Sequence, residues 1–207
     1  MVESQNHGFT IQECFQHPEI LPGWTSDRGR SKFDVPGKYT PDGNPWSIKA
    51  IRVGGAIDMG SAPRMWDIFE NGPDIWLYLV TYQQNGPYKE LLSLDKYLLD
   101  VEVRKKLQGF ITLQEVLDLE KKLVNDFPVG THAQARKWWK EQRNLLADRA
   151  GGCKLGAKVD SRDQRRWQCS IKREVLMDIF GPLRNSLEID KGFCLPEKIL
   201  SSPRRRG

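Results

Sequence analysis

The sequence has few of the residues from which metal sites and nucleophilic centres are most often built. Its 207 residues include four cysteines and three histidines, all scattered, and no C-x-x-C pair. We therefore predict neither a structural zinc site nor a His-based hydrolase. The cysteines are expected to be free thiols of an intracellular protein.

Long apolar runs and phosphate-binding glycine motifs are missing as well. No apolar stretch approaches the roughly 20 residues that cross a bilayer, and residues 1–15 lack the basic start and apolar segment of a secretory signal. Neither G-x-x-x-x-G-K nor G-x-G-x-x-G occurs, so we predict no nucleotide cofactor. An intracellular protein outside the membrane is expected.

The composition, 39% hydrophobic and 29% charged, is typical of a globular chain with one substantial core. The net charge of +5 is unevenly distributed. Lys and Arg dominate residues 154–173, and the chain ends in "SSPRRRG", a tail at 201–207 that we predict to be disordered. The basic segment favours a polyanionic partner.

The predicted elements alternate between strands and helices. Strands are expected at 32–35, 46–53 and 75–82, with a Pro- and Gly-rich turn at 36–45. Another turn at Asn85-Gly86 is expected to lead into a further strand. The run at 75–82 is apolar enough for a central strand that is covered on both faces. Helices are expected at 8–17, from Ser61 to 70, and at 94–107, 112–126 and 131–150. This order predicts a mixed α/β fold in a single domain over 1–207.

An acidic and a basic residue lie on two strands that the turn at 36–45 places side by side. Asp34 is in "KFDV", and Lys49 is in "PWSIKAIR", 15 residues later. A carboxylate that holds Mg²⁺ and a lysine that stabilises developing negative charge are what a metal-dependent phosphodiesterase needs. A cross-strand ion pair in contact with solvent is the structural alternative.

The arrangement Phe33-Asp34 … Ser47-Ile48-Lys49 resembles the PD-(D/E)XK nuclease superfamily, which includes most type II restriction endonucleases. The helix with Gln12-Glu13 and the stretch "QRRWQCSI" are similar to parts of that family, and the resemblance spans roughly residues 5–180. It implies a restriction-endonuclease-like central mixed sheet flanked by helices. It also implies Mg²⁺, double-stranded DNA as substrate, and a homodimer in a bacterial or viral restriction system.

The chain departs from the family pattern at Ser47, where the family usually has Asp or Glu. The missing charge is expected from Glu13 or Asp58; otherwise Asp34, the Ile48 carbonyl and waters hold a single ion. The alternative of a degenerate relative that binds DNA without cutting it stays open.

The tripeptide Ser-Ile-Lys occurs again at 170–172, downstream of Asp160 and Asp163. No turn separates two strands there, and arginines flank Asp163, so a role in DNA contact suits this copy better. If 164–171 is a strand, Arg165, Trp167, Cys169 and Ile171 share a packed face, and Gln164, Arg166, Gln168 and Ser170 share a polar one. The residue types fit contacts to phosphates and base edges; a solvated edge strand is the alternative. The predicted DNA-contacting residues are Arg52, Arg64, Lys158, Arg162, Gln164, Arg165, Arg166 and Gln168.

The function expected from these residues and the resemblance is a Mg²⁺-dependent, sequence-specific endonuclease. Asp34, Lys49, Ser47 and Glu13 are the candidate catalytic residues, and Asp34, Ile48 and Asp58 are the candidate metal ligands. The alternative is a non-catalytic DNA-binding protein with a degenerate site.

Overall fold

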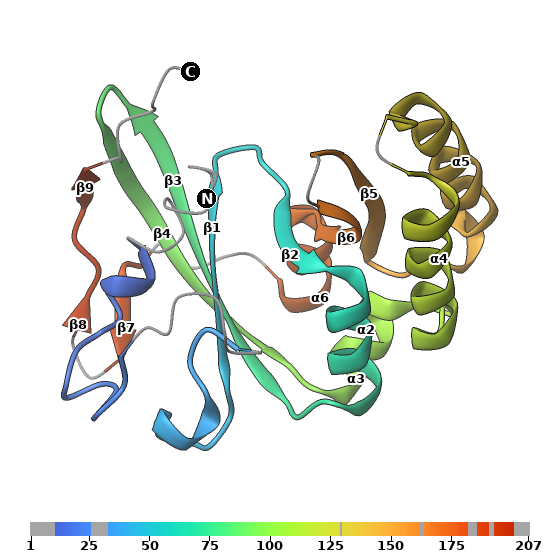
Figure 1. The fold of residues 1–207 in the computed structure, drawn as a ribbon. Helices are drawn as coiled ribbons and strands as arrows, with labels where there is room; N and C mark the ends of the chain where they lie inside the picture. The colour runs from blue at the N-terminus through green and yellow to red at the C-terminus, as the bar shows by residue number, and fades with distance from the viewer. Residues whose placement is uncertain are drawn as a thin grey trace. The chain divides into compact units, whose positions relative to one another are not determined.

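The computed structural model describes residues 11–25, 33–128, 130–161, 164–181, 186–190 and 193–200 (Figure 1). The chain forms two compact units. Unit 1 comprises residues 1–55, 73–99 and 180–207, and unit 2 comprises residues 56–72 and 100–179. Each unit is assembled from segments that are distant in sequence. The single domain over 1–207 stays a prediction.

Unit 1 is built on a four-stranded mixed sheet. Its order is β1 (Trp46–Arg52), β3 (Ile75–Asn85), β4 (Tyr88–Leu99) and β9 (Lys198–Leu200). β1 is parallel to β3, and the other neighbours are antiparallel. β3 lies between two strands and is buried over 75 and 77–81, which confirms the predicted central strand. The predicted turn after Asn85 is also confirmed, since Gly86 has a φ of 56° there, a conformation that favours glycine.

One face of this sheet forms the core of unit 1. Trp46 and Ile48 of β1 belong to a buried apolar cluster with Tyr78 and Phe15. The rings of Phe15 and Tyr78 meet edge to face at 5.4 Å. Because successive side chains of a strand point to opposite faces, Ser47 and Lys49 are on the other face of β1. A short 3₁₀ turn, η1 (Gly37–Tyr39), and the small strand pair of β7 (Glu188–Asp190) and β8 (Phe193–Cys194) complete the unit.

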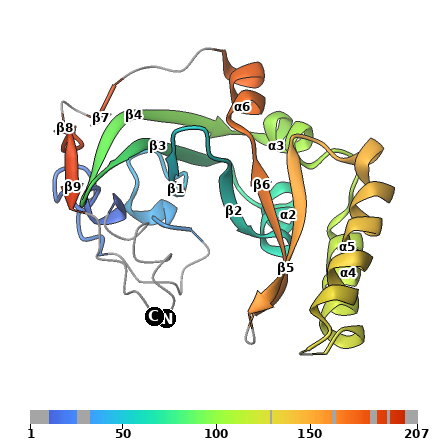
Figure 2. The ribbon, with the colours of Figure 1, turned by 90° about the horizontal axis from the view of Figure 1, so that it is seen from above.

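Unit 2 combines a second sheet with helices. The strands β2 (Ile57–Ser61), β6 (Gln164–Ile171) and β5 (Cys153–Ser161) form an antiparallel sheet in the order β2-β6-β5. Its helices are α2 (Ala62–Asn71), α3 (Val101–Gln108), α4 (Leu113–Asp126), α5 (His132–Leu145) and α6 (Arg173–Phe180), with a 3₁₀ turn η2 at Ala147–Arg149. α4 and α5 lie side by side in Figure 1 and in Figure 2. Trp138 of α5 meets Trp167 of β6 edge to face at 6.1 Å, so the helices cover one face of this sheet.

The mixed α+β class that the sequence predicted is confirmed, and so are several helices. α2 begins after Ser61, and α4 begins after Thr112, which forms a capping box with Glu115. Trp138 of α5 packs against Trp167, whereas Leu145 at the end of the same helix is 74% exposed. None of the described helices is long and apolar enough to cross a bilayer.

Three predicted elements were wrong in part. Residues 94–99 are strand rather than helix, because β4 pairs with β3 along its whole length; the helix starts only after Asp100, whose side chain accepts from the Val103 N–H. Residue 32 of the predicted strand at 32–35 lies outside the described residues, and residues 33–35 contribute a single bridge between Val35 and Trp46, because the Asp34 side chain takes the Ile48 N–H that the next step of the ladder would use. The described part of the predicted helix at 8–17 is helical only over 11–13.

Candidate active site

The Asp34 carboxylate gathers four hydrogen-bond donors at the free edge of β1. Its Oδ2 accepts from the Ile48 N–H at 2.7 Å, from Lys49 Nζ at 3.1 Å and from the Ser47 hydroxyl at 3.3 Å. Its Oδ1 accepts from Gln12 Nε2 at 2.7 Å. The two residues that the sequence paired, Asp34 and Lys49, are therefore in direct contact.

The edge position of β1 explains why the carboxylate lies there. On one side β1 pairs with β3, and on the other side its only backbone partner is Val35, which exchanges both backbone hydrogen bonds with Trp46 among the described residues. Residues two apart on a strand present their backbone groups to the same edge, so Ile48 would face the next partner of that ladder. Among the described residues this ladder does not continue to Ile48, and the Asp34 side chain accepts the Ile48 N–H in place of a neighbouring carbonyl.

The ion pair is shielded without being fully buried. The side chains of Lys49 and Asp34 are 17% and 20% exposed. Ser47 is buried, at 6% exposed. A pair in this setting is reachable by an anionic substrate and is less screened by salt than a surface pair.

A second carboxylate shares a row of the sheet with Lys49. Lys49 is in register with Leu79 of β3, and Leu79 is in register with Asp95 of β4. Asp95 is only 3% exposed, and its Oδ2 accepts from the Ser93 hydroxyl at 3.2 Å. The sequence reasoning missed Asp95 because it assigned residues 94–107 to a helix. Polar residues at the buried positions 89, 93 and 95 hide the strand pattern of β4 in the sequence.

The N-terminal turn contributes an amide rather than an acid. Gln12 contacts Asp34, whereas the side chain of Glu13, the residue chosen from the sequence, is exposed. Asp58 belongs to unit 2, where its Oδ1 accepts from the Gly60 N–H at 2.8 Å. Over the residues that the structure describes, no group of three or more His, Cys, Asp or Glu side chains is suited to hold a metal ion.

No family model, curated protein or solved structure matches the chain.

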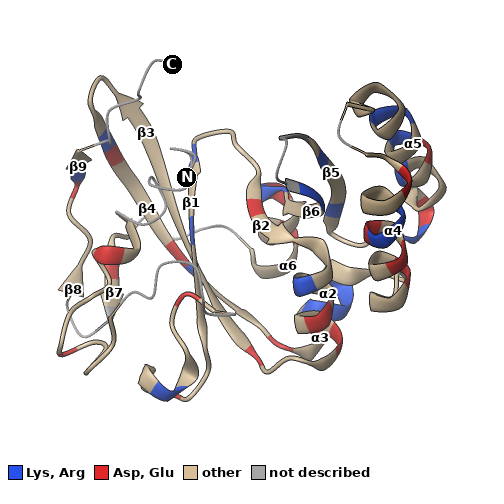
Figure 3. Ribbon diagram, viewed as in Figure 1, with Lys and Arg blue, Asp and Glu red and all other residues tan. Residues whose placement is uncertain are grey.

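The sheet of unit 2 has a polar face with cationic side chains. Across β5 and β6, Lys158 is opposite Arg166, Gly156 is opposite Gln168, and Lys154 is opposite Ser170. Because neighbours in register share a face, these side chains lie together, and the Lys and Arg positions of the two strands are marked in Figure 3. The intervening residues Leu155, Trp167, Cys169 and Ile171 are buried, which confirms the predicted alternation of β6.

The other basic residues chosen from the sequence have different surroundings. Arg165 shares the face of Trp167, and its guanidinium nitrogens are buried and bond to none of the described residues. Arg52 and Arg64 are exposed. Arg162 and the tail at 201–207 lie outside the described residues, as does the side chain of Gln164.

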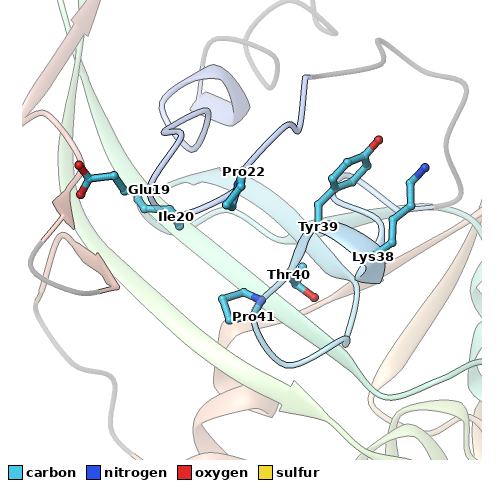
Figure 4. Close-up of a pocket in the computed structure, with 7 residues that line it drawn as sticks. All are labelled: Glu19, Ile20, Pro22, Lys38, Tyr39, Thr40 and Pro41. Carbon is cyan, nitrogen blue, oxygen red and sulfur yellow. The ribbon is translucent and has the colours of Figure 1, made fainter.

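A cavity of about 300 Å³ lies elsewhere in unit 1 (Figure 4). It is lined by residues 19, 20 and 22 and by the loop from Lys38 to Pro41, and it includes neither Asp34 nor Lys49. Lys38 and Tyr39 project the same way from the loop, with Lys38 Nζ 4.7 Å from the centre of the Tyr39 ring. This lysine makes a cation–π contact with the Tyr39 ring, and the cavity lining also includes the carboxylate of Glu19.

Proposed function

We propose that this chain is a Mg²⁺-dependent endonuclease that hydrolyses phosphodiester bonds of double-stranded DNA, with Asp34 and Lys49 as its catalytic pair. The observation that supports the proposal most directly is the 3.1 Å contact between Lys49 Nζ and Asp34 Oδ2 beside the open edge of β1. A restriction-type enzyme acting as a homodimer is the specific form that we expect from the resemblance.

Each residue of the cluster has a distinct task in the proposed reaction. Lys49 donates to a nonbridging oxygen of the scissile phosphate, where negative charge grows as water attacks. Asp34 holds the Lys49 ammonium at the strand edge. Gln12 and the Ile48 N–H fix the carboxylate from two directions, so that its orientation is set before substrate arrives. Ser47 adds a hydroxyl that can orient the attacking water.

The donor set fits one magnesium ion that retains several waters. Asp34 supplies a carboxylate, and the Ile48 carbonyl lies at the same strand edge as the Ile48 N–H. Mg²⁺ in proteins is commonly held by one or two carboxylates together with substrate phosphates. When bound, it would neutralise phosphate charge and lower the pKa of a bound water. Because Oδ2 already accepts three donors, we expect little metal affinity before DNA binds.

The polar face of β5 and β6 is the proposed DNA contact surface. Lys158 and Arg166 are cross-strand neighbours that can contact adjacent phosphates, and Gln168 lies on the same face with an amide that can contact a base edge. Phosphate contacts release counterions, so the affinity for DNA should fall steeply with salt.

The decisive experiment compares the two copies of Ser-Ile-Lys. Purified protein is incubated with plasmid DNA and Mg²⁺, with and without EDTA, and the same assay is run on Lys49→Met and Lys172→Met. Removing a donor that stabilises the transition state costs about 10²–10³-fold in rate, so we expect Lys49→Met to lose cleavage. Lys172 is exposed after β6, and Lys172→Met should keep it. Cleavage by Lys49→Met at the wild-type rate would refute the assignment.

A non-catalytic DNA-binding protein is the second candidate. It is favoured by the donors that saturate the Asp34 carboxylate and by the absence, within the described ranges, of a group of three potential metal ligands. In the same assay this candidate predicts a gel shift of intact plasmid that is insensitive to EDTA and to Lys49→Met.

A further inference from the structure

Unit 2 contains a cavity of about 480 Å³ that lies within the range of small-molecule sites, roughly 300–1,000 Å³. Its polar lining comes from Arg143, Asn144, Lys154 and Ser170. Its apolar lining comes from Ile111, Leu146, Ala147, Ala150 and Leu155. Among the described residues, two cations and no acidic side chain line it, so the cavity favours an anion.

Both cations are available to a ligand. Arg143 makes a contact of 5.1 Å with the Trp139 ring, which supports the guanidinium plane while leaving its edge N–H groups free to donate. Lys154 extends from the polar face beside Ser170. Among the described residues neither cation has an acidic partner, and the nearby Arg149 is paired with Glu115 at 2.7 Å instead.

The part of the wall formed by Ala150 and Gly151 is held in place before any ligand arrives. Ala150 forms a β-bridge with Gly109, and the Gly152 N–H donates to the Lys106 carbonyl at 3.0 Å. The backbones pass so closely that a Cβ at Gly151 would lie 2.4 Å from the Lys106 carbonyl oxygen. A wall fixed in this way reduces the ordering cost of binding.

We propose that this cavity binds a free small organic phosphate with a flat apolar body, such as a nucleoside monophosphate. Arg143 and Lys154 bind the phosphate, with Ser170 and Asn144 as hydrogen-bonding neighbours. The body lies against Leu146, Ala147 and Ile111. This site is independent of the Asp34 pair and of any cleavage of DNA.

The test is calorimetric titration of the full chain, without DNA or metal, using AMP, adenosine and inorganic phosphate as probes. AMP should bind at least tenfold more tightly than either fragment, because only AMP engages both the cations and the apolar wall. Arg143→Gln and Lys154→Met should each weaken AMP about tenfold or more, since each removes a charge-assisted contact. Ala147→Phe, which fills the cavity and keeps both cations, should weaken AMP as well.

Lys140→Met is the matched control, because Lys140 is an exposed cation of the same helix outside the cavity lining. It should bind AMP as the wild type does. The proposal is overturned if AMP does not bind at millimolar concentration, if phosphate alone binds as tightly as AMP, or if Lys140→Met weakens AMP as much as Arg143→Gln. Loss of DNA cleavage has no bearing on these outcomes.

Discussion

Replacing Asp34 with alanine should destabilise the protein far more than replacing its partner Lys49 with methionine. Asp34→Ala leaves the Ile48 N–H at the edge of β1 without its acceptor at 2.7 Å and removes the acceptor of Gln12 at 2.7 Å. A shielded donor left unpaired costs about 1–3 kcal/mol. Part of the Gln12 loss is recovered by water, so we expect Asp34→Ala to cost about 2–4 kcal/mol in total.

Lys49→Met removes only one partner of a partly exposed pair and keeps the length of the side chain. Exposed and partly exposed pairs contribute about 0–1 kcal/mol, so the free energy of unfolding should stay within about 1 kcal/mol of wild type. Asp34→Asn retains one acceptor oxygen and should fall between the two variants.

The assay is urea unfolding at pH 7, followed by tryptophan fluorescence. The dependence of the free energy of unfolding on urea concentration is compared between variants, to verify that each exposes a similar surface area when it unfolds. If Asp34→Ala were no less stable than Lys49→Met, the account of Asp34 as the acceptor that closes the edge of β1 would be wrong. Combined with the cleavage assay, the comparison separates a structural loss from a catalytic one.

Further predictions concern unit 2 and the buried lysine of β4. The Arg149 hydrogen bonds lower the pKa of Glu115 from 4.5 to about 2, so the ionised Glu115 stabilises the fold fully above about pH 4.5, and this contribution is lost as the pH falls toward 2. In Glu115→Gln the free energy of unfolding should therefore depend less on pH in that window. Trp138→Ala should lower the free energy of unfolding in urea by about 2–4 kcal/mol because it removes the contact with Trp167 of β6. Leu145→Ser, at an exposed position, should change it by less than about 0.5 kcal/mol. Equal losses of stability in the two variants would contradict the packing of Trp138 against β6. Burial lowers the pKa of Lys89 from 10.5 to about 8, so stability rises with pH from 8 to 10.5. Lys89→Met should raise the midpoint of urea unfolding above that of the wild type at pH 7, and this difference should shrink as the pH rises from 8 to 10.5. A midpoint below that of the wild type at pH 7 would contradict a cost of burying the charged lysine.

The elements with strong local signals were predictable from sequence, and those decided by pairing were not. The capping box of α4, the Gly86 turn and the alternation of β6 each depend on neighbouring residues. The strand at 94–99 was missed because "LLSLDKYLL" is rich in good helix formers, and only its pairing with β3 makes it a strand.

The same division holds within the site. The meeting of Asp34 and Lys49 followed from the turn between them, which is a local feature. The choice of Gln12 rather than Glu13 depends on how a single N-terminal turn packs, since neighbouring residues on a turn face different directions. No pattern in the sequence distinguishes the two.

Because segments of the two units alternate along the chain, the units should complete their folding at different stages of synthesis. The last segment of unit 2 ends at residue 179, whereas β4 pairs with β9, which is formed by residues 198–200 and is synthesised later. On a ribosome, unit 2 can therefore reach its native form while the mixed sheet that presents Asp34 still has an open flank. In a nascent chain that is stalled before β9 emerges, unit 2 should resist protease, while the edge of β1 beside Asp34 should still be cleaved.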